Sequence, residues 1–210
     1  MDIYGKLLAM STPPINKYTV SSNEEEGEVL PNLLGITTAK EIAEAEFMGF
    51  VEANKKAIDE LSDDTRFNLE YLYTLHKNAL GHLYSFAGKL RTVNMSKDNF
   101  SFPPASFLVQ SICDFEVDFL TPLKNISDDA LLIQLARMHA ELLFIHPFRE
   151  GNGRTIRLFT NMIFLSKTGK EFDFAILDKN LKTYIAAVQQ AAQKEYKLME
   201  NLFLQMTDSL

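Results

Sequence analysis

The chain has 210 residues, of which 46% are hydrophobic and 23% charged, and these values are typical of one globular domain with its own core. Its formal net charge of −7 argues against broad nucleic-acid binding, because a phosphate backbone needs a basic surface. No apolar run approaches the length of a membrane span and the N-terminus lacks the pattern of a signal peptide, so we expect a cytoplasmic protein, with later export by a dedicated secretion system left open.

The N-terminal residues predict an irregular arm, which we delimit as residues 1–31. This stretch contains several prolines and the acidic run Glu24–Glu26, and it is poor in core-forming residues. A single folded domain is expected over residues 32–210. The lone cysteine, Cys113, has no partner for an internal disulfide and is expected to be a small buried apolar residue.

Helical patterning begins at Thr38, which forms a capping-box pattern with Glu41. Asp63 or Asp64 is the expected cap of a second helix, whose apolar residues recur along one side between residues 69 and 83.

A different texture follows, with β-branched and turn residues between Arg91 and Phe102. We interpret this stretch as a short hairpin, called the flap here, that turns around Lys97-Asp98-Asn99. Further helices are expected over residues 106–120, from Ser127 or Asp128 to Phe144, over 154–167 with a stop at Gly169, and over 179–191 and 193–206. The predicted fold is all-α, a helical bundle with one short β-hairpin flap.

The segment from His146 to Arg157 carries the chemistry. His146 follows an apolar run and precedes Pro147, and a proline forces the residue before it out of the helical region, so a helix should end there. A histidine at such a rim can take a proton near neutral pH. Glu150 is a lone carboxylate, and beside phosphates such a group usually holds Mg²⁺.

The sequence Gly151-Asn152-Gly153 then runs into a predicted helix that carries Arg154 and Arg157 on one face. Such a turn presents unpaired backbone N–H groups to an anion, and arginines add hydrogen bonds to phosphate oxygens. Each residue alone is explained as well by a simple turn, a surface ion pair or a packed histidine. Together they describe a nucleoside-triphosphate site with its own general base.

This segment matches the signature His-x-Phe-x-(Asp/Glu)-Gly-Asn-Gly-Arg-x-x-Arg, and the chain therefore resembles the Fic family. The resemblance extends to the helix and flap over residues 75–97 and to the lead-in Asn32-Leu33-Leu34-Gly35-Ile36, so that it covers about residues 30 to 205. It implies the Fic fold, a helical bundle with a flap.

The activity that the resemblance implies is adenylylation, the transfer of AMP from ATP to a Tyr, Thr or Ser hydroxyl of a target protein. His146 would be the base, Phe148 would anchor the loop and Glu150 would hold Mg²⁺ between the α- and β-phosphates. The phosphates would lie on Gly151, Asn152, Gly153, Arg154 and Arg157. The target would add a strand to the 91–102 flap, where Lys97 would contact the nucleotide or the target, or remain a solvated lysine.

Related activities stay open. Doc-type relatives phosphorylate their targets and carry lysine where this chain has Gly153, so Gly153 favours AMP transfer. Other nucleotidyl transfer, removal of AMP, and a nucleotide-binding module without useful turnover are the alternatives.

Many Fic proteins are held inactive by a helix with the pattern (Ser/Thr)-x-x-x-Glu-(Gly/Asn), whose glutamate pairs with the second motif arginine, here Arg157. Ser22 and Glu26 fit this pattern, although an acidic run is more often a solvated stretch. Control by a separate antitoxin protein is the other option. The remaining histidines show no metal-ligand spacing; His139 is expected in the bundle, and Tyr184 beside the adenine or in the core.

Overall fold

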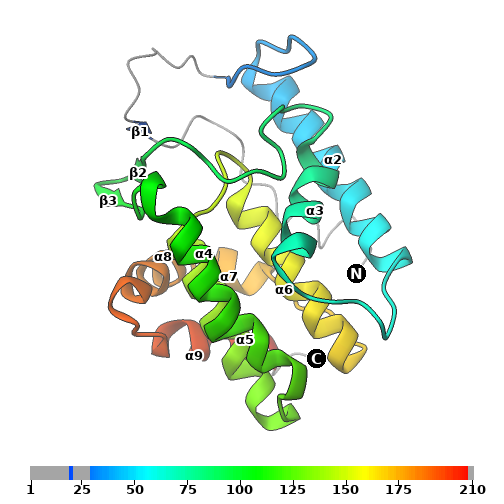
Figure 1. Ribbon diagram of the computed structural model, residues 1–210, viewed down its shortest axis with the longest axis vertical. Helices are drawn as coiled ribbons and strands as arrows, with labels where there is room; N and C mark the ends of the chain where they lie inside the picture. Colours follow the sequence, from blue (N-terminus) through cyan, green and yellow to red (C-terminus); the bar gives the residue numbers. More distant parts are fainter. Residues whose placement is uncertain (1–18, 21–28, 208–210) are drawn as a thin grey trace.

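Helices make up most of the chain in the computed structural model, which describes residues 19–20 and 29–207 (Figure 1). The helices are α2 (Ala39–Asp59), α3 (Leu69–Leu80), η1 (Ala105–Phe107), α4 (Leu108–Phe115), η2 (Glu116–Leu120), η3 (Thr121–Asn125), α5 (Asp128–Ile145), α6 (Asn152–Thr168), α7 (Ala175–Lys179), α8 (Leu181–Gln190), η4 (Ala191–Gln193) and α9 (Lys197–Thr207). The strands are β1 (Thr19–Val20), β2 (Met95–Lys97) and β3 (Phe100–Ser101). The predicted fold, a helical bundle with a short β-flap, is confirmed.

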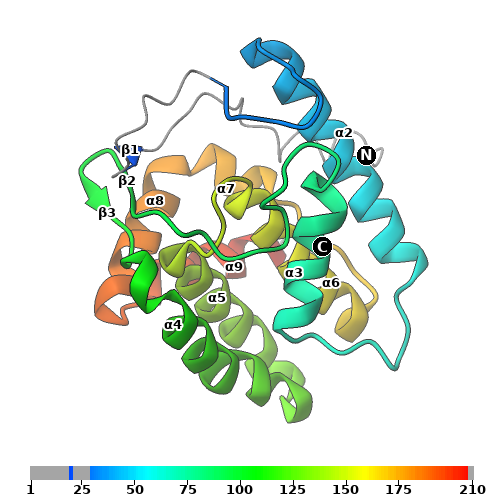
Figure 2. The same ribbon diagram turned by 45° about the horizontal axis from the view of Figure 1, so that its top comes forward.

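Helix α6 lies at the centre of the bundle and packs against α2, α3 and α5 (Figures 1 and 2). Of its 17 residues, 11 are buried, so this helix is enclosed nearly all round. The segment that the sequence predicts to carry the chemistry, residues 146–157, runs into α6, which begins at Asn152. Its first turn is therefore anchored in the core of the molecule.

The predicted start of α2 is confirmed. Thr38 is its N-cap, and the Thr38 hydroxyl accepts a hydrogen bond from the Glu41 backbone N–H at 3.3 Å. The same hydroxyl donates to the Glu41 carboxylate at 2.6 Å, so the two side chains of the predicted box contact each other, and the bond to the Glu41 N–H is the one that caps the helix.

The expectation that Asp63 or Asp64 caps the second helix is wrong. Both residues lie in a turn that the Thr65 side chain closes by accepting from the Ser62 N–H at 3.0 Å. The cap of α3 is Asn68, whose side-chain oxygen accepts from the Tyr71 N–H at 2.9 Å. An asparagine caps as well as an aspartate, and the loop that precedes α3 is longer than we expected.

The flap is the predicted hairpin, with β2 and β3 antiparallel and Lys97 opposite Phe100. Asp98 and Asn99 have φ angles of 48° and 65°, the left-handed pair that a two-residue hairpin turn requires. The sequence did not indicate the third strand, β1, which pairs with the other edge of β2.

Two smaller expectations are also corrected. Cys113 is exposed, not buried, because it lies on the outer side of α4, whose buried residues are Leu108, Ile112 and Phe115. One continuous helix was expected over residues 106–120. The structure has the 3₁₀ helix η1, then α4, then the π-helix η2, and the 3₁₀ helix η3 follows.

Gly49 allows α2 and α3 to approach closely. A Cβ added there would lie 2.0 Å from the Ala79 carbonyl oxygen, so Gly49→Ala must push the two helices apart. We expect this overpacking to cost about 1–3 kcal/mol or more of unfolding free energy, measured as a shift of the denaturant midpoint. Gly153→Ala is the matched control, because a Cβ there meets no described atom within 4 Å, and equal midpoints would contradict the prediction.

Within residues 19–20 and 29–207, none of the helices combines the length and the hydropathy that crossing a bilayer requires.

Candidate active site

The backbone at His146 leaves the helix abruptly. Helix α5 ends at Ile145, one residue beyond the predicted end at Phe144, and His146 adopts a left-handed conformation with φ 53° and ψ 61°. Such a conformation costs free energy in a residue other than glycine. Arg91 holds it, because the Arg91 Nε donates to the His146 carbonyl oxygen at 2.8 Å.

Arg91 is a clamp that sequence reasoning missed. Its guanidinium also donates to the carbonyl oxygens of Val93 at 2.7 Å and Pro103 at 2.6 Å, which lie at the two ends of the flap. Its backbone N–H donates to the Pro147 carbonyl at 2.8 Å. The flap is thereby fixed relative to His146. Burial lowers the pKa of Arg91 to about 10, and the charge of Arg149 adds to the shift.

The His146 side chain is held in one tautomer. Its Nδ1 lies 3.1 Å from the Leu143 carbonyl oxygen, which can only accept, so Nδ1 carries the proton and Nε2 carries the lone pair. The ring stacks on Phe102 of the flap with centroids 3.9 Å apart. Burial lowers the pKa of His146 to about 3, and the positive charges of Arg91 and Lys97 act in the same direction. The imidazole is therefore neutral at physiological pH.

The loop after His146 is closed by an amide side chain. The Asn152 side-chain oxygen accepts from the Phe148 N–H at 2.8 Å, and its nitrogen donates to the Phe148 carbonyl at 2.7 Å. The Phe148 side chain is fully buried and stacks on the His76 ring at 3.9 Å. The Asn152 side chain thus fixes the shape of the loop. Its backbone N–H, at the first residue of α6, is the group that could bind a ligand.

His76 joins the loop to the segment before the flap. Its Nδ1 accepts from the Gly88 N–H at 2.7 Å, so its Nε2 is the donor to the Glu150 carbonyl oxygen at 2.9 Å. Burial lowers the pKa of His76 to about 4, which keeps this neutral bridge intact. The sequence contains no spacing signal for such a role.

The start of α6 offers backbone donors. Gly151 is the N-cap, with φ 75°, and the first helical bond runs from the Thr155 N–H to the Gly151 carbonyl at 3.0 Å. The N–H groups of residues 152–154 precede that bond and have no acceptor within the helix. A Cβ at Gly153 would meet no described atom within 4 Å. This open helix end suits an anion.

Arg154 reaches back toward α2. Its NH2 lies 2.6 Å from the Glu46 carboxylate and 3.4 Å from that of Glu150, and its guanidinium lies 4.7 Å from the centre of the Phe50 ring. Glu46 is completely buried and also accepts from the Tyr84 hydroxyl at 2.5 Å. A buried carboxylate that the sequence did not indicate therefore positions the first motif arginine.

Arg157 points to the other side of the site. It makes a two-pronged pair with Asp178, at 2.8 Å and 3.3 Å, and its guanidinium lies 5.4 Å from the centre of the Tyr184 ring. Burial lowers the pKa of Arg157, but Tyr184 and Asp178 outweigh this effect and the net shift is upward.

Tyr184 belongs to a buried hydrogen-bonded chain. The Thr160 hydroxyl donates to the Ile156 carbonyl and accepts from the His139 Nδ1 at 2.9 Å, so the His139 Nε2 accepts from the Tyr184 hydroxyl at 2.8 Å. Burial lowers the pKa of His139 to about 3. His139 lies in the bundle as expected, and Tyr184 is a core residue that touches the site through Arg157.

The two buried histidines of this framework predict a pH-dependent stability. The folded pKa values of His76 (about 4) and His139 (about 3) lie below the unfolded value of about 6.5. The unfolding free energy therefore has its full value above about pH 6.5. It falls as the pH drops, because only the unfolded chain takes up the protons. By pH 5 each histidine should cost about 2 kcal/mol.

The measurement is the denaturant midpoint between pH 7 and pH 5. The buried His146, whose pKa is also about 3, adds a similar contribution, so a His139→Gln variant, which keeps a donor and an acceptor, should lose about a third of the dependence that the three buried histidines cause. An unchanged slope in that variant would contradict the assignment.

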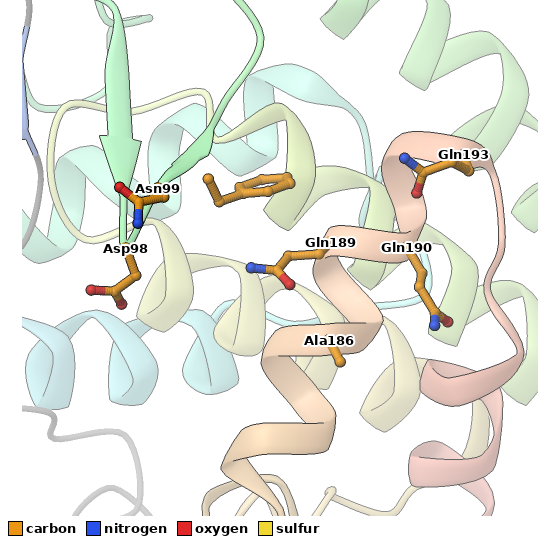
Figure 3. Close-up of a pocket in the computed structure, with 7 residues that line it drawn as sticks. Asp98, Asn99, Ala186, Gln189, Gln190 and Gln193 are labelled. Atoms are coloured by element: carbon orange, nitrogen blue, oxygen red, sulfur yellow. The ribbon is translucent and has the colours of Figure 1, made fainter.

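A hollow of about 400 Å³ lies beside the flap (Figure 3). The turn at Asp98 and Asn99 faces the glutamine side chains of α8 and η4 across it (Figure 3). Amide groups both donate and accept hydrogen bonds. Lys97, on the adjoining strand, is near enough to His146 for its charge to lower the pKa of that residue.

No cluster of three or more metal-ligating side chains occurs among the described residues. Glu150 accepts from the Gly151 N–H at 2.8 Å and from Arg154 at 3.4 Å. A single carboxylate fits Mg²⁺ that also binds phosphate oxygens and water, and it does not fit a site built from protein ligands alone. Ser22 and Glu26 lie outside the described residues.

The fold and the site define a class: helical domains in which a buried histidine precedes a helix whose first N–H groups have no acceptor within the helix. Residues 66–164 match the Fic/DOC family. It is 29% identical over 150 residues to the protein adenylyltransferase VbhT of Bartonella schoenbuchensis (strain DSM 13525 / NCTC 13165 / R1), a match that covers 69% of this chain and 31% of that protein. The chain thus spans about a third of that relative's length.

Solved structures share the fold. The N-terminal FIC domain of Bep8, a VirB-translocated effector protein from Bartonella sp. 1-1C, superposes with a TM-score of 0.71 at 21% identity, covering 94% of this chain and 96% of that one. BepC of Bartonella tribocorum, with bound AMPPNP, gives a TM-score of 0.70 at 19% identity, covering 87% and 94% of the two chains.

Proposed function

We propose that this chain transfers AMP from ATP to a hydroxyl group of a target protein. One observation carries the proposal. A neutral histidine, His146, is held in the tautomer with a lone pair on Nε2, and it lies a short loop before the N-terminus of α6. A base next to an anion site is what the transfer of a phosphoryl-type group to a hydroxyl needs. The adenylyltransferase relative supports the choice of AMP.

The reaction follows from these positions. The hydroxyl oxygen of the target attacks the α-phosphorus, and its proton passes to the His146 Nε2. The bond between the α-phosphorus and the bridging oxygen breaks, and pyrophosphate leaves. In the described state the pKa of His146 is about 3, and the negative charge of a bound triphosphate would raise it toward a value suited to a base.

The nucleotide would be held by the chain's own groups at both sides of α6. We assign phosphate oxygens to the backbone N–H groups of residues 152–154 and to the guanidinium groups of Arg154 and Arg157, with Gly151 shaping the turn. Glu150 would hold Mg²⁺, which supplies positive charge at the phosphates. Arg154 would have to turn part of its hydrogen bonding from Glu46 and Glu150 toward the nucleotide.

The target protein would dock on the 91–102 flap as an added strand. Lys97 and the hollow beside the flap turn would contact the residues that flank the hydroxyl. We place the catalytic domain at residues 32–210 and the reaction in the cytoplasm or, after export, in another cell.

The test is an assay with ATP radiolabelled at the α-phosphate, Mg²⁺ and a cell lysate. Label on protein supports AMP transfer, and its loss in His146→Ala supports the base. Label only from ATP labelled at the γ-phosphate would indicate phosphorylation and defeat the argument from Gly153.

The alternatives give different results in the same assay. A binding module without turnover would give no label. Inhibition by the segment around Ser22 and Glu26 would give label only after Glu26→Gly. Release of AMP from a modified protein would indicate the reverse reaction, and a separate antitoxin protein would suppress labelling when it is added.

A further inference from the structure

The flap already carries a strand on one of its edges. Strand β1 pairs antiparallel with β2, with Thr19 opposite Ser96 and Val20 opposite Met95. The sheet order is β1-β2-β3, so β1 occupies the edge of β2 that the hairpin leaves open. An open strand edge is a template for any extended peptide.

This edge is fixed relative to the base. The Met95 side chain is buried, and the Met95 carbonyl accepts from the Phe102 N–H at 3.1 Å. Phe102 in turn stacks on His146, and Arg91 ties both ends of the flap to the His146 backbone. A strand on β2 is thus held in a defined position with respect to Nε2.

The other edge of the flap is less suited to a docking strand. Phe100 of β3 and the turn residues line the hollow, and residues of α8 and η4 line its other side (Figure 3). The edge of β2 that pairs with β1 is therefore the edge of the flap on which an added strand is observed.

We propose that β1 is a built-in competitor for the target protein: the target's strand and β1 use the same edge of β2, and a target must displace β1 to be modified. This inference rests on the proposed function. β1 contains two residues, so few backbone hydrogen bonds hold it, but its covalent link gives it a high effective concentration. Few hydrogen bonds and a high effective concentration together suit a strand that pairs with β2 when no target is bound and that a target can displace.

Occupancy of the edge is tested without any enzymatic activity. The probe is a fluorescein-labelled peptide with the sequence of residues 14–24, and the protein is the full chain with Thr19→Pro and Val20→Pro, which cannot pair as a strand. We expect the peptide to bind this variant at least tenfold more tightly than the native chain. A control peptide with prolines at the same two positions should bind neither. Equal affinity for both proteins, no binding to either, or equal binding of the control peptide would overturn the inference.

Competition with the target is tested by label transfer from ATP to lysate proteins. The double proline variant should label them several-fold faster than the native chain, whereas Met10→Pro, outside β1, should not. Unchanged labelling by the variant, with an active native chain, would overturn the competition. If no form transfers label while the peptide binds as expected, the proposed function fails and the occupancy of the edge stands.

Discussion

Replacing His146 by alanine should lower kcat/KM for AMP transfer by about 10²- to 10⁴-fold, the range that a positioned general base contributes. The variant keeps the backbone donors of α6 and both arginines, so the affinity for ATP should change little. Initial rates with a labelled target, and the ATP dissociation constant from calorimetry, give the two quantities separately.

The control must separate chemistry from packing, because alanine also removes the stacking of the imidazole on Phe102. His82→Ala is the matched variant: His82 is exposed, and its Nε2 lies 3.3 Å from the Ala45 carbonyl oxygen. It should keep native activity. A His146→Ala protein that folds, binds ATP and retains more than about a tenth of the native rate would show that another group takes the proton.

Local signals account for the parts of the fold that the sequence predicted. The cap at Thr38, the turn at Asp98-Asn99 and the stop at Gly169 each depend on a few neighbouring residues. Helix α5 ends just before His146, where Pro147 predicted a break, although His146 is left-handed and not extended as a following proline favours. The candidate site was predicted in the same way, since its histidine, glycines and arginines lie within one segment of twelve residues.

The parts that were missed depend on pairs that are far apart in the chain. Glu46 holds Arg154 and Asp178 holds Arg157, but a glutamate or aspartate on a helix looks like a solvated residue until the fold brings a partner to it. Arg91 is a similar case. β1 was missed because a pattern of two residues is too short to indicate a strand.

The second prediction with a large expected effect concerns Arg157. Arg157→Ala should lower kcat/KM by about 10²- to 10³-fold, the cost of removing one preorganised donor from a developing negative charge. Arg157→Lys should restore little of this loss. A lysine keeps the charge, but it lacks the planar fork that pairs with both oxygens of Asp178 and still presents donors to phosphate.

Asp178→Asn separates position from charge in this prediction. The variant leaves Arg157 in place and keeps an oxygen acceptor but removes the charge of its partner. Because the Arg157 side chain is only 9% exposed, some loss of unfolding free energy is expected, and the denaturant midpoint is measured beside the kinetics. If Asp178 positions the guanidinium, the KM for ATP should rise severalfold while kcat falls less than in Arg157→Ala. If Arg157→Lys instead works as well as the native chain, only a positive charge is required at this point, and the paired geometry of Arg157, Asp178 and Tyr184 has no part in the reaction.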